Sequence, residues 1–316
     1  MPELCHKDFT PIHNFRVNYI RDGLIEEFHD GICQMGFDNS IDNTPYYLRS
    51  CAKPLQASLL ISNKIDFTPE ELAFCSGSHA GESCHIKTAK GILKKLGLSE
   101  TNLKCGIHTP LSRSMQDKML LNAERPSALH NNCSGKHLGF LAICIKNGWN
   151  IENYYESNHP LQIEVKNRIY DLCELPYKND YPITTDGCGV PIVSMPLKNI
   201  LIGYRNLAKL YPEIINAILK NPYIYGGENR LDTEIIQSSS NVIAKVGAGG
   251  LCVVHNIKKN QNFVIKMNDA STEARRIAVL ETINALKWAD IKFDKTIKTL
   301  HNTIVGNITV TNCNIG

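Results

Sequence analysis

Ser50 and Lys53 are the two residues of this chain whose types and spacing most directly suggest chemistry. Residues three positions apart share a face of a helical turn, so the hydroxyl and the amine can meet. A lysine that burial keeps neutral can take the proton of a serine hydroxyl, which then becomes an acylatable nucleophile. The chain has a single Ser-x-x-Lys, but about one or two are expected by chance. The pair indicates acyl transfer only if the rest of the sequence supports it.

The composition is that of a globular protein with a substantial core. Of 316 residues, 43% are hydrophobic and 21% are charged, as in ordinary soluble domains. The net charge is +3, from 34 basic and 31 acidic residues, without a basic stripe or an acidic tail. We therefore expect no nucleic-acid partner. The longest apolar run near the middle, Phe140 to Ile145, is too short to cross a membrane.

Cysteine usage and the start of the chain indicate a cytoplasmic protein. The segment Met1 to Asp8 has no apolar stretch of the kind found in signal peptides. The twelve cysteines are irregularly spaced, which favours reduced thiols over a disulfide framework. No Cys-x-x-Cys occurs, and this excludes zinc fingers and thioredoxin-type centres.

The pattern of elements predicts an α+β fold. A hairpin is predicted from Phe15 to Met35 around Asp22-Gly23, followed by a polar loop from 38 to 44, and strands are predicted at 251–255 and 263–267. Helical spacing recurs in seven segments, at 53–62, 68–75, 85–96, 136–147, 159–175, 233–245 and 271–288. Strands at both chain ends should assemble one mainly antiparallel sheet flanked by helices. We expect one domain over residues 1–316, with a division into two lobes and a helical insertion at about 66–180 as the alternative.

Two polar clusters stand beside apolar sequence. In the segment 76–85, small residues allow close backbone approach while Ser78, His79 and Glu82 offer donors and acceptors. In the segment 130–140, paired asparagines and a thiol precede a helix start whose N–H groups suit a carboxylate or oxyanion. Loop formation and simple helix capping are the alternative interpretations of the two clusters.

Two further clusters contain glycines. In 185–191, Asp186 could hold an ammonium group, or the segment could be a tight turn at the end of a strand. The segment 245–252 leads through a hairpin to Lys266, which could bind a carboxylate or assist proton transfer. Most strand lysines, however, are solvated edge residues.

Taken together, these clusters resemble the asparaginase II family of the rhizobial type, which is unrelated in sequence to the Thr-dependent asparaginases. The resemblance covers about residues 15 to 280, and its most specific string is Asn131-Asn132-Cys133-Ser134-Gly135-Lys136-His137. The other matching motifs are Arg49-Ser50-x-x-Lys53-Pro54-x-Gln56, Ser78-His79-x-Gly81-Glu82, Asp186-Gly187-Cys188-Gly189-Val190-Pro191 and Arg230-x-Asp232-Thr233. The resemblance implies a fold like that of serine β-lactamases and glutaminases, an α/β/α sandwich.

The resemblance also implies roles for individual residues. Ser50 would be the nucleophile, Lys53 its base, Ser78 a proton relay and Lys266 the second lysine of the pocket. The implied substrate-binding residues are Arg49, His79, Asn132 and Asp186, of which Asp186 would hold the substrate amino group. The implied zinc ligands are Cys133, Lys136 and Cys188, and the alternative is three buried residues without a metal. A homodimer is implied as well.

The chain departs from the family pattern at three positions. Ala80 stands where many relatives have serine, Gly249 replaces a usual glutamate, and Ala270 replaces a usual glycine. None of them belongs to the Ser50–Lys53 pair, but Gly249 removes a charge.

The sequence predicts an amidohydrolase that converts L-asparagine to L-aspartate and ammonia. A glutaminase, a peptidase or a β-lactamase-like hydrolase on the same scaffold is the alternative enzyme, although no Lys-Thr-Gly or Ser-Asp-Asn follows the Ser-x-x-Lys. A catalytically silent homologue that binds zinc or an amino acid is the alternative from another class.

Overall fold

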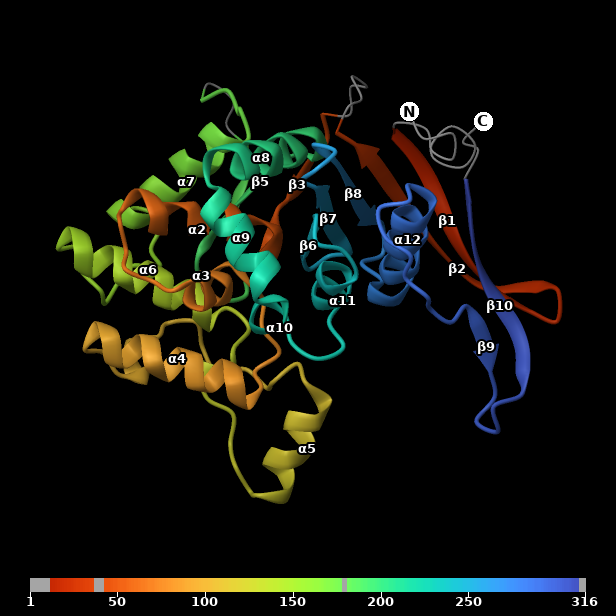
Figure 1. Ribbon diagram of the computed structural model, residues 1–316, viewed down its shortest axis with the longest axis horizontal. Coiled ribbons are helices and arrows are strands. Elements are labelled where there is room, and N and C mark those ends of the chain that lie inside the picture. The colour runs from red at the N-terminus through yellow and green to blue at the C-terminus, as the bar shows by residue number, and fades with distance from the viewer. Residues whose placement is uncertain (1–11, 37–42, 178–180, 313–316) are drawn as a thin grey trace.

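The computed structural model describes residues 12–36, 43–177 and 181–312 (Figure 1). The chain start at 1–8 and most of the predicted loop at 38–44 lie outside these residues. Among the described residues, no helix combines the length and the apolar character that a membrane span requires.

A seven-stranded antiparallel sheet, in the order β6-β7-β8-β2-β1-β10-β9, forms the middle of the molecule. The first strands of the chain lie between strands from its last third, so the prediction that the two ends of the chain build the sheet is confirmed. A second, three-stranded sheet has the order β3-β5-β4. The strands are β1 (Ile12–Arg21), β2 (Leu24–Met35), β3 (Pro45–Tyr47), β4 (Ile183–Thr185), β5 (Pro191–Pro196), β6 (Val242–Val246), β7 (Leu251–Asn256), β8 (Gln261–Met267), β9 (Thr296–Lys298) and β10 (Ile304–Asn312).

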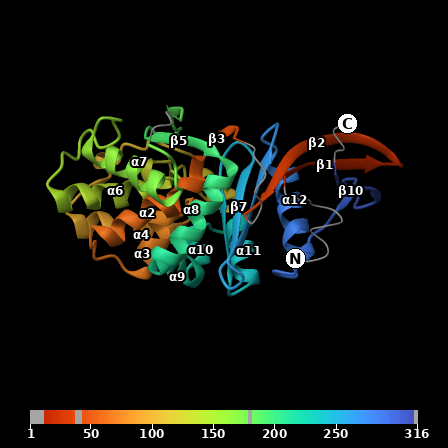
Figure 2. The same ribbon diagram turned by 90° about the horizontal axis from the view of Figure 1, so that it is seen from above.

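Helices cover both faces of the large sheet (Figure 2). Those from α2 to α10 lie on one side, where one hydrophobic core forms, and α12 packs on the other side over a second core. The predicted α+β class, in the form of an α/β/α sandwich, is confirmed. The helices are α2 (Lys53–Ser62), α3 (Pro69–Ser76), α4 (Ser83–Leu96), α5 (Arg113–Leu121), α6 (Ser134–Asn147), α7 (Pro160–Leu172), α8 (Leu197–Leu210), α9 (Pro212–Lys220), α10 (Pro222–Tyr225), α11 (Leu231–Ser238) and α12 (Thr272–Ala285), with short 3-10 turns η1 (Arg49–Ala52), η2 (Glu100–Asn102) and η3 (Ala128–His130).

Local signals explain why several predictions hold. Thr68 caps α3 by accepting the N–H of Glu71, whose carboxylate accepts the N–H of Thr68, and Pro69 occupies the first helical position. Helix α6 ends at Asn147 and is capped by Gly148, whose backbone φ of 67° is left-handed. The predicted hairpin is observed as β1 and β2, and the predicted strand pair as β7 and β8.

The predicted helix at 233–245 is wrong. Helix α11 ends at Ser238, and the chain then forms β6. Three consecutive serines, Ser238 to Ser240, favour local backbone hydrogen bonds over helix continuation. All five residues of β6 are buried, so this strand has no solvent face and lacks the alternating pattern that marks a strand in a sequence. The sequence patterns also do not predict α5, α8–α10, the three-stranded sheet, β9 or β10.

His255 on β7 is a buried histidine whose two ring nitrogens have no hydrogen-bond partner among the described residues. Burial, together with the positive charge of Arg205, lowers the pKa of His255 to about 4. The folded protein therefore binds this proton less readily than the unfolded chain. The stabilising contribution of the neutral ring is fully present above about pH 6.5 and is lost as the pH falls toward 4.

We expect His255→Phe to remove this source of acid sensitivity. Between about pH 7 and about pH 4.5, the free energy of unfolding should fall by about 2 to 3 kcal/mol more in the natural protein than in the variant. Urea unfolding at the two pH values measures the difference. Equal losses in the two proteins would show that His255 does not contribute to acid sensitivity.

Candidate active site

A cavity of about 210 Å³ opens where η1, the loop before α6 and the loop between β4 and β5 meet. It brings together six of the residues that the sequence analysis selects, Arg49, Ser50, Asn132, Cys133, Asp186 and Cys188. Its wall also includes His108, Asn131, Gly187 and Ala248. Segments that lie far apart in the sequence thus meet around one candidate nucleophile.

The backbone around Ser50 is a 3-10 turn that runs directly into helix α2. Arg49 has a φ of 49°, in the left-handed region that residues with a side chain rarely adopt. Such backbone strain is often found at functional sites. The N–H of Lys53 donates to the carbonyl of Ser50, so the two residues lie one turn apart as their spacing predicts. The Ser50 hydroxyl has no hydrogen-bond partner within the described part of the chain.

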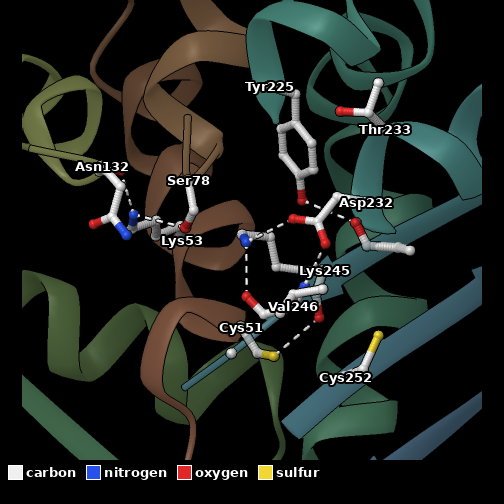
Figure 3. A network of polar contacts seen from close by, with 12 residues as sticks. Cys51, Lys53, Ser78, Asn132, Tyr225, Asp232, Thr233, Lys245, Val246 and Cys252 are labelled. Carbon is white, nitrogen blue, oxygen red and sulfur yellow. Dashed lines mark hydrogen bonds and ion pairs between the residues drawn. The ribbon is translucent and has the colours of Figure 1, made fainter. Parts of the chain in front are cut away.

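Lys53 is the buried amine of the site, with 1% of its surface exposed. Its Nζ donates to Ser78 Oγ at 2.8 Å and to the carbonyl of Asn132 at 2.8 Å (Figure 3). The pKa of Lys53 is lowered to about 8, mainly by burial and also by the ammonium groups of Lys136 and Lys245, while the sulfurs of Cys133 and Cys188 oppose this shift. A lysine with this pKa is neutral often enough near pH 7 to act as a base.

Ser78 lies behind the cavity wall, with 2% of its surface exposed. Its N–H donates to the carbonyl of Tyr225 at 3.0 Å, which fixes the loop that carries it. Its hydroxyl oxygen accepts a hydrogen bond from the Lys53 amine. The hydroxyl proton therefore stays available for donation to another group. The structure therefore connects Lys53 directly to Ser78, in the place where the sequence predicts a relay.

Two opposite charges, those of Arg49 and Asp186, meet at the cavity. Arg49 Nη2 lies 3.1 Å from Asp186 Oδ1. Asp186 is held in a tight turn, because its N–H donates to the carbonyl of Val190 and its carbonyl accepts from Gly189. The cavity wall thus offers both a cation and an anion to a small ligand.

A second group at the cavity consists of two cysteines and a lysine, all three at most 5% exposed. Lys136 Nζ lies 2.9 Å from Cys188 Sγ. A hydrogen bond from the Cys188 thiol holds the pKa of Cys133 well below its ordinary value, and the same contact raises that of Cys188. Burial lowers the pKa of Lys136, but the two sulfurs outweigh it and raise that pKa. The three predicted metal ligands therefore lie together.

The structure does not place His79 at the cavity. Its ring is fully buried and stacks between those of Phe74 and His85. Its Nε2 lies 2.8 Å from Ser134 Oγ, and its Nδ1 accepts the N–H of Gly81. Both ring nitrogens are thus engaged, and the ring supports the loop that contains Ser78. A direct contact between His79 and a substrate is not available in this arrangement.

Lys266 is also absent from the cavity wall. It is half-buried on β8, where its Nζ donates to the carbonyl of Met267 and lies 6.0 Å from the centre of the Tyr46 ring. Burial lowers its pKa, and Asp269 opposes this. No contact connects its amine to Ser50, Lys53 or Ser78 in the ranges that the structure describes. The predicted role of the second lysine is without support from this geometry.

The sequence analysis assigns no role to three residues near the site. His108 lines the cavity, and no local motif surrounds it. Lys245 and Asp232 form a fully buried ion pair at 3.0 Å beside the Lys53 contacts (Figure 3). The sequence does contain a sign of Lys245, because it is a lysine inside the apolar run 242–246. Most of that run falls within the helix predicted at 233–245, so the run is not recognised as a buried strand.

We expect Lys53→Met to stabilise the protein at neutral pH. The pKa of Lys53 falls from 10.5 to about 8 on folding, which costs about 3 kcal/mol below pH 8. Loss of the hydrogen bonds to Ser78 and Asn132 offsets about 2 kcal/mol of the gain. The variant should therefore be about 1 kcal/mol more stable at pH 7, as urea unfolding can measure.

The sign of this difference should change with pH. The folded pKa lies below the unfolded one, so the cost disappears as the pH rises from about 8 to about 10.5. Above that window the natural protein should be the more stable one. A variant that is less stable at pH 7, with no change across the window, would contradict the prediction.

The chain matches a known protein family over almost its whole length. The profile of the L-asparaginase II family matches residues 17–314. The solved structure of a β-lactamase from Mycobacterium bovis aligns with 87% of this chain and 96% of its own, with 12% sequence identity and a TM-score of 0.39. No curated protein matches the chain at a significant level. Because the family profile spans almost the whole chain, including every residue of the cavity wall, the chain belongs to the L-asparaginase II family.

Proposed function

We propose that this amidohydrolase is an L-asparaginase that forms an acyl intermediate on Ser50. The observation that carries the proposal is the buried amine of Lys53, which lies one helical turn from Ser50 and donates to the Ser78 hydroxyl and the Asn132 carbonyl. Such surroundings favour the neutral amine that a base requires. Membership of the L-asparaginase II family supports an amide as the substrate.

In the proposed reaction, neutral Lys53 takes the proton of the Ser50 hydroxyl as the oxygen attacks the side-chain amide carbon. The tetrahedral intermediate collapses and releases ammonia, whose nitrogen receives a proton from Lys53 through the Ser78 hydroxyl. Water then hydrolyses the β-aspartyl ester and frees Ser50. Backbone N–H groups at the start of the turn, including that of Ser50, would stabilise the oxyanion.

The charges at the cavity support an α-amino acid as the substrate. Arg49 and Asp186 lie 3.1 Å apart and match the carboxylate and the ammonium of a zwitterion. A zwitterionic substrate that binds between them would replace the Arg49–Asp186 ion pair with two ion pairs, one to each of these side chains. The Asn132 side chain also lines the wall and could accept a hydrogen bond from the amide or donate one to it.

The size of the cavity argues against larger substrates. Its volume of about 210 Å³ lies below the range of about 300–1,000 Å³ typical of sites for drug-sized ligands. This disfavours a peptide or a β-lactam antibiotic. Asparagine and glutamine differ by one methylene, so parallel assays with both are needed. The predicted homodimer and cytoplasmic location stay predictions.

Zinc at Cys133, Lys136 and Cys188 is part of the same proposal. The donor set fits the metal, because two sulfurs and an amine nitrogen converge in a buried position beside the cavity. The thiols and the amine would have to lose their protons on binding. Zinc would supply Lewis-acid character next to the substrate, while Ser50 and Lys53 perform the proton transfers described above.

Ser50→Ala should abolish ammonia release from L-asparagine, with kcat reduced by at least about a thousandfold. The reason is that no other hydroxyl lines the described cavity wall. A coupled ammonia assay with L-asparagine and L-glutamine in parallel measures the loss. Ser62→Ala, at the end of the helix that follows the turn, is the control, since the Ser62 hydroxyl donates to the Ser58 carbonyl and does not line the cavity.

Turnover retained in the Ser50 variant would overturn the nucleophile assignment. A natural protein that binds asparagine but releases no ammonia would favour the silent homologue. Release from glutamine at a rate equal to that from asparagine would replace the substrate assignment with a broader one.

The purified protein should contain about one zinc ion per chain. A double variant, Cys133→Ser with Cys188→Ser, should contain none, because the hydroxyl is a poor zinc ligand. Elemental mass spectrometry measures the content, and Cys144→Ser is a control because this cysteine neither lines the cavity nor lies near another group of potential metal ligands among the described residues. Zinc retained in the double variant would contradict the assigned ligands.

A further inference from the structure

Asp232 and Lys245 form an ion pair in which neither side chain is exposed. Lys245 Nζ lies 3.0 Å from Asp232 Oδ2 and also donates to the carbonyl of Val246 at 2.8 Å. Asp232 Oδ1 accepts the N–H of Val246 at 3.0 Å. The pair therefore fixes both the side chain and the backbone at the end of β6. Burying two charges gains little stability over an apolar pair of similar shape, so stability alone does not account for it.

The end of β6 holds the turn that carries the nucleophile. Cys51, the residue after Ser50, donates its thiol to the carbonyl of Lys245 at 3.2 Å (Figure 3). A Cβ added at Gly247 would lie 3.1 Å from Cys51 Sγ and 3.2 Å from the carbonyl of Leu48. The strand end thus packs directly against the turn, with no room for an intervening side chain. A shift of the strand end would move Ser50.

The same strand holds the loop that contains Ser78. Tyr225 accepts the N–H of Ser78 with its carbonyl at 3.0 Å, and its hydroxyl donates to the carbonyl of Ala244 at 3.2 Å. Its ring centre lies 5.6 Å from Lys245 Nζ. Ser78 is therefore tied through one tyrosine to the strand to which the Ser50 turn is also tied.

We propose that Asp232 and Lys245 are positioning residues for the reaction, and that their ion pair sets the placement of Ser50 relative to Ser78. The inference rests on the proposed function for its catalytic meaning. Neither residue lines the cavity or contacts Ser50 or Ser78 directly. The pair acts through the backbone of β6, which reaches the Ser50 turn by way of Cys51 and the Ser78 loop by way of Tyr225.

The test is the double variant Asp232→Asn with Lys245→Met, which removes both charges and preserves their approximate shapes. The matched control is Glu234→Gln with Arg276→Met, because Glu234 lies on the same helix and pairs with Arg276 on α12 in a part-exposed ion pair. Asp232→Asn alone is the second variant in case the double variant does not fold, since its amide oxygen can still accept from Val246.

We expect the kcat for ammonia release to fall by about 10- to 100-fold in the double variant while KM changes by less than about twofold. The double variant leaves the binding groups at the cavity unchanged. A displacement of Ser50 relative to Ser78 should therefore lower kcat and leave KM nearly unchanged. The control should keep both constants. An unchanged kcat, or an equal loss in the control, would overturn the proposal.

Hydrogen–deuterium exchange tests the placement without relying on activity. Amides of the segments 48–53 and 76–80 should exchange faster in the double variant and at the natural rate in the control. If the natural protein releases no ammonia, the proposed function fails, yet this measurement still decides whether the pair holds the two segments. Unchanged exchange in both segments would overturn the inference. Asp232→Asn alone leaves the buried Lys245 without its anion and should show at least as large a change.

Discussion

The site depends on one physical constraint, which is that the amine of Lys53 must stay out of water. Helix α2 satisfies this constraint, because eight of its ten residues are buried, Lys53 among them. The helix packs against α3, α6, α7 and α8, so the amine lies inside the core of the helical layer. Burial then lowers the pKa of Lys53 to about 8. A helix placed at the surface would carry the same Ser-x-x-Lys with a fully protonated lysine and no base.

The topology of the sheet explains how distant segments meet around that amine. Strand β6 is the edge strand next to the helical layer, and its end reaches the turn that carries Ser50 through Cys51. The loop of the short sheet, between β4 and β5, brings Asp186 and Cys188 to the same cavity. Neither juxtaposition follows from local sequence, because both require the complete order of strands.

Short-range sequence signals predicted many of the individual turns, caps and helix starts. The β1–β2 hairpin, the cap of α3 and the start of α2 follow from turn and capping residues, and the sequence clusters supply six residues of the cavity wall. The positions of the remaining site residues depend on burial, which short-range sequence signals do not reveal. His79 is absent from the wall because its ring nitrogens bind Ser134 and Gly81 in the core. Lys245 was missed because a strand buried on both faces shows no alternation, so its apolar run was taken for a helix.

Three buried lysines, Lys53, Lys136 and Lys245, show why only one of them suits the role of a base. Lys245 faces a carboxylate, that of Asp232, and Lys136 faces two sulfurs, which raise its pKa despite burial. The Lys53 amine donates to a hydroxyl and a carbonyl, and its burial outweighs the effect of the nearby sulfurs on its pKa. Each anion stabilises the ammonium beside it, and the two ammonium groups in turn disfavour a third charge on Lys53. The lowered pKa of Lys53 is therefore set first by burial and then by the whole set of charges, with Lys136 and Lys245 lowering it and the sulfurs of Cys133 and Cys188 opposing them.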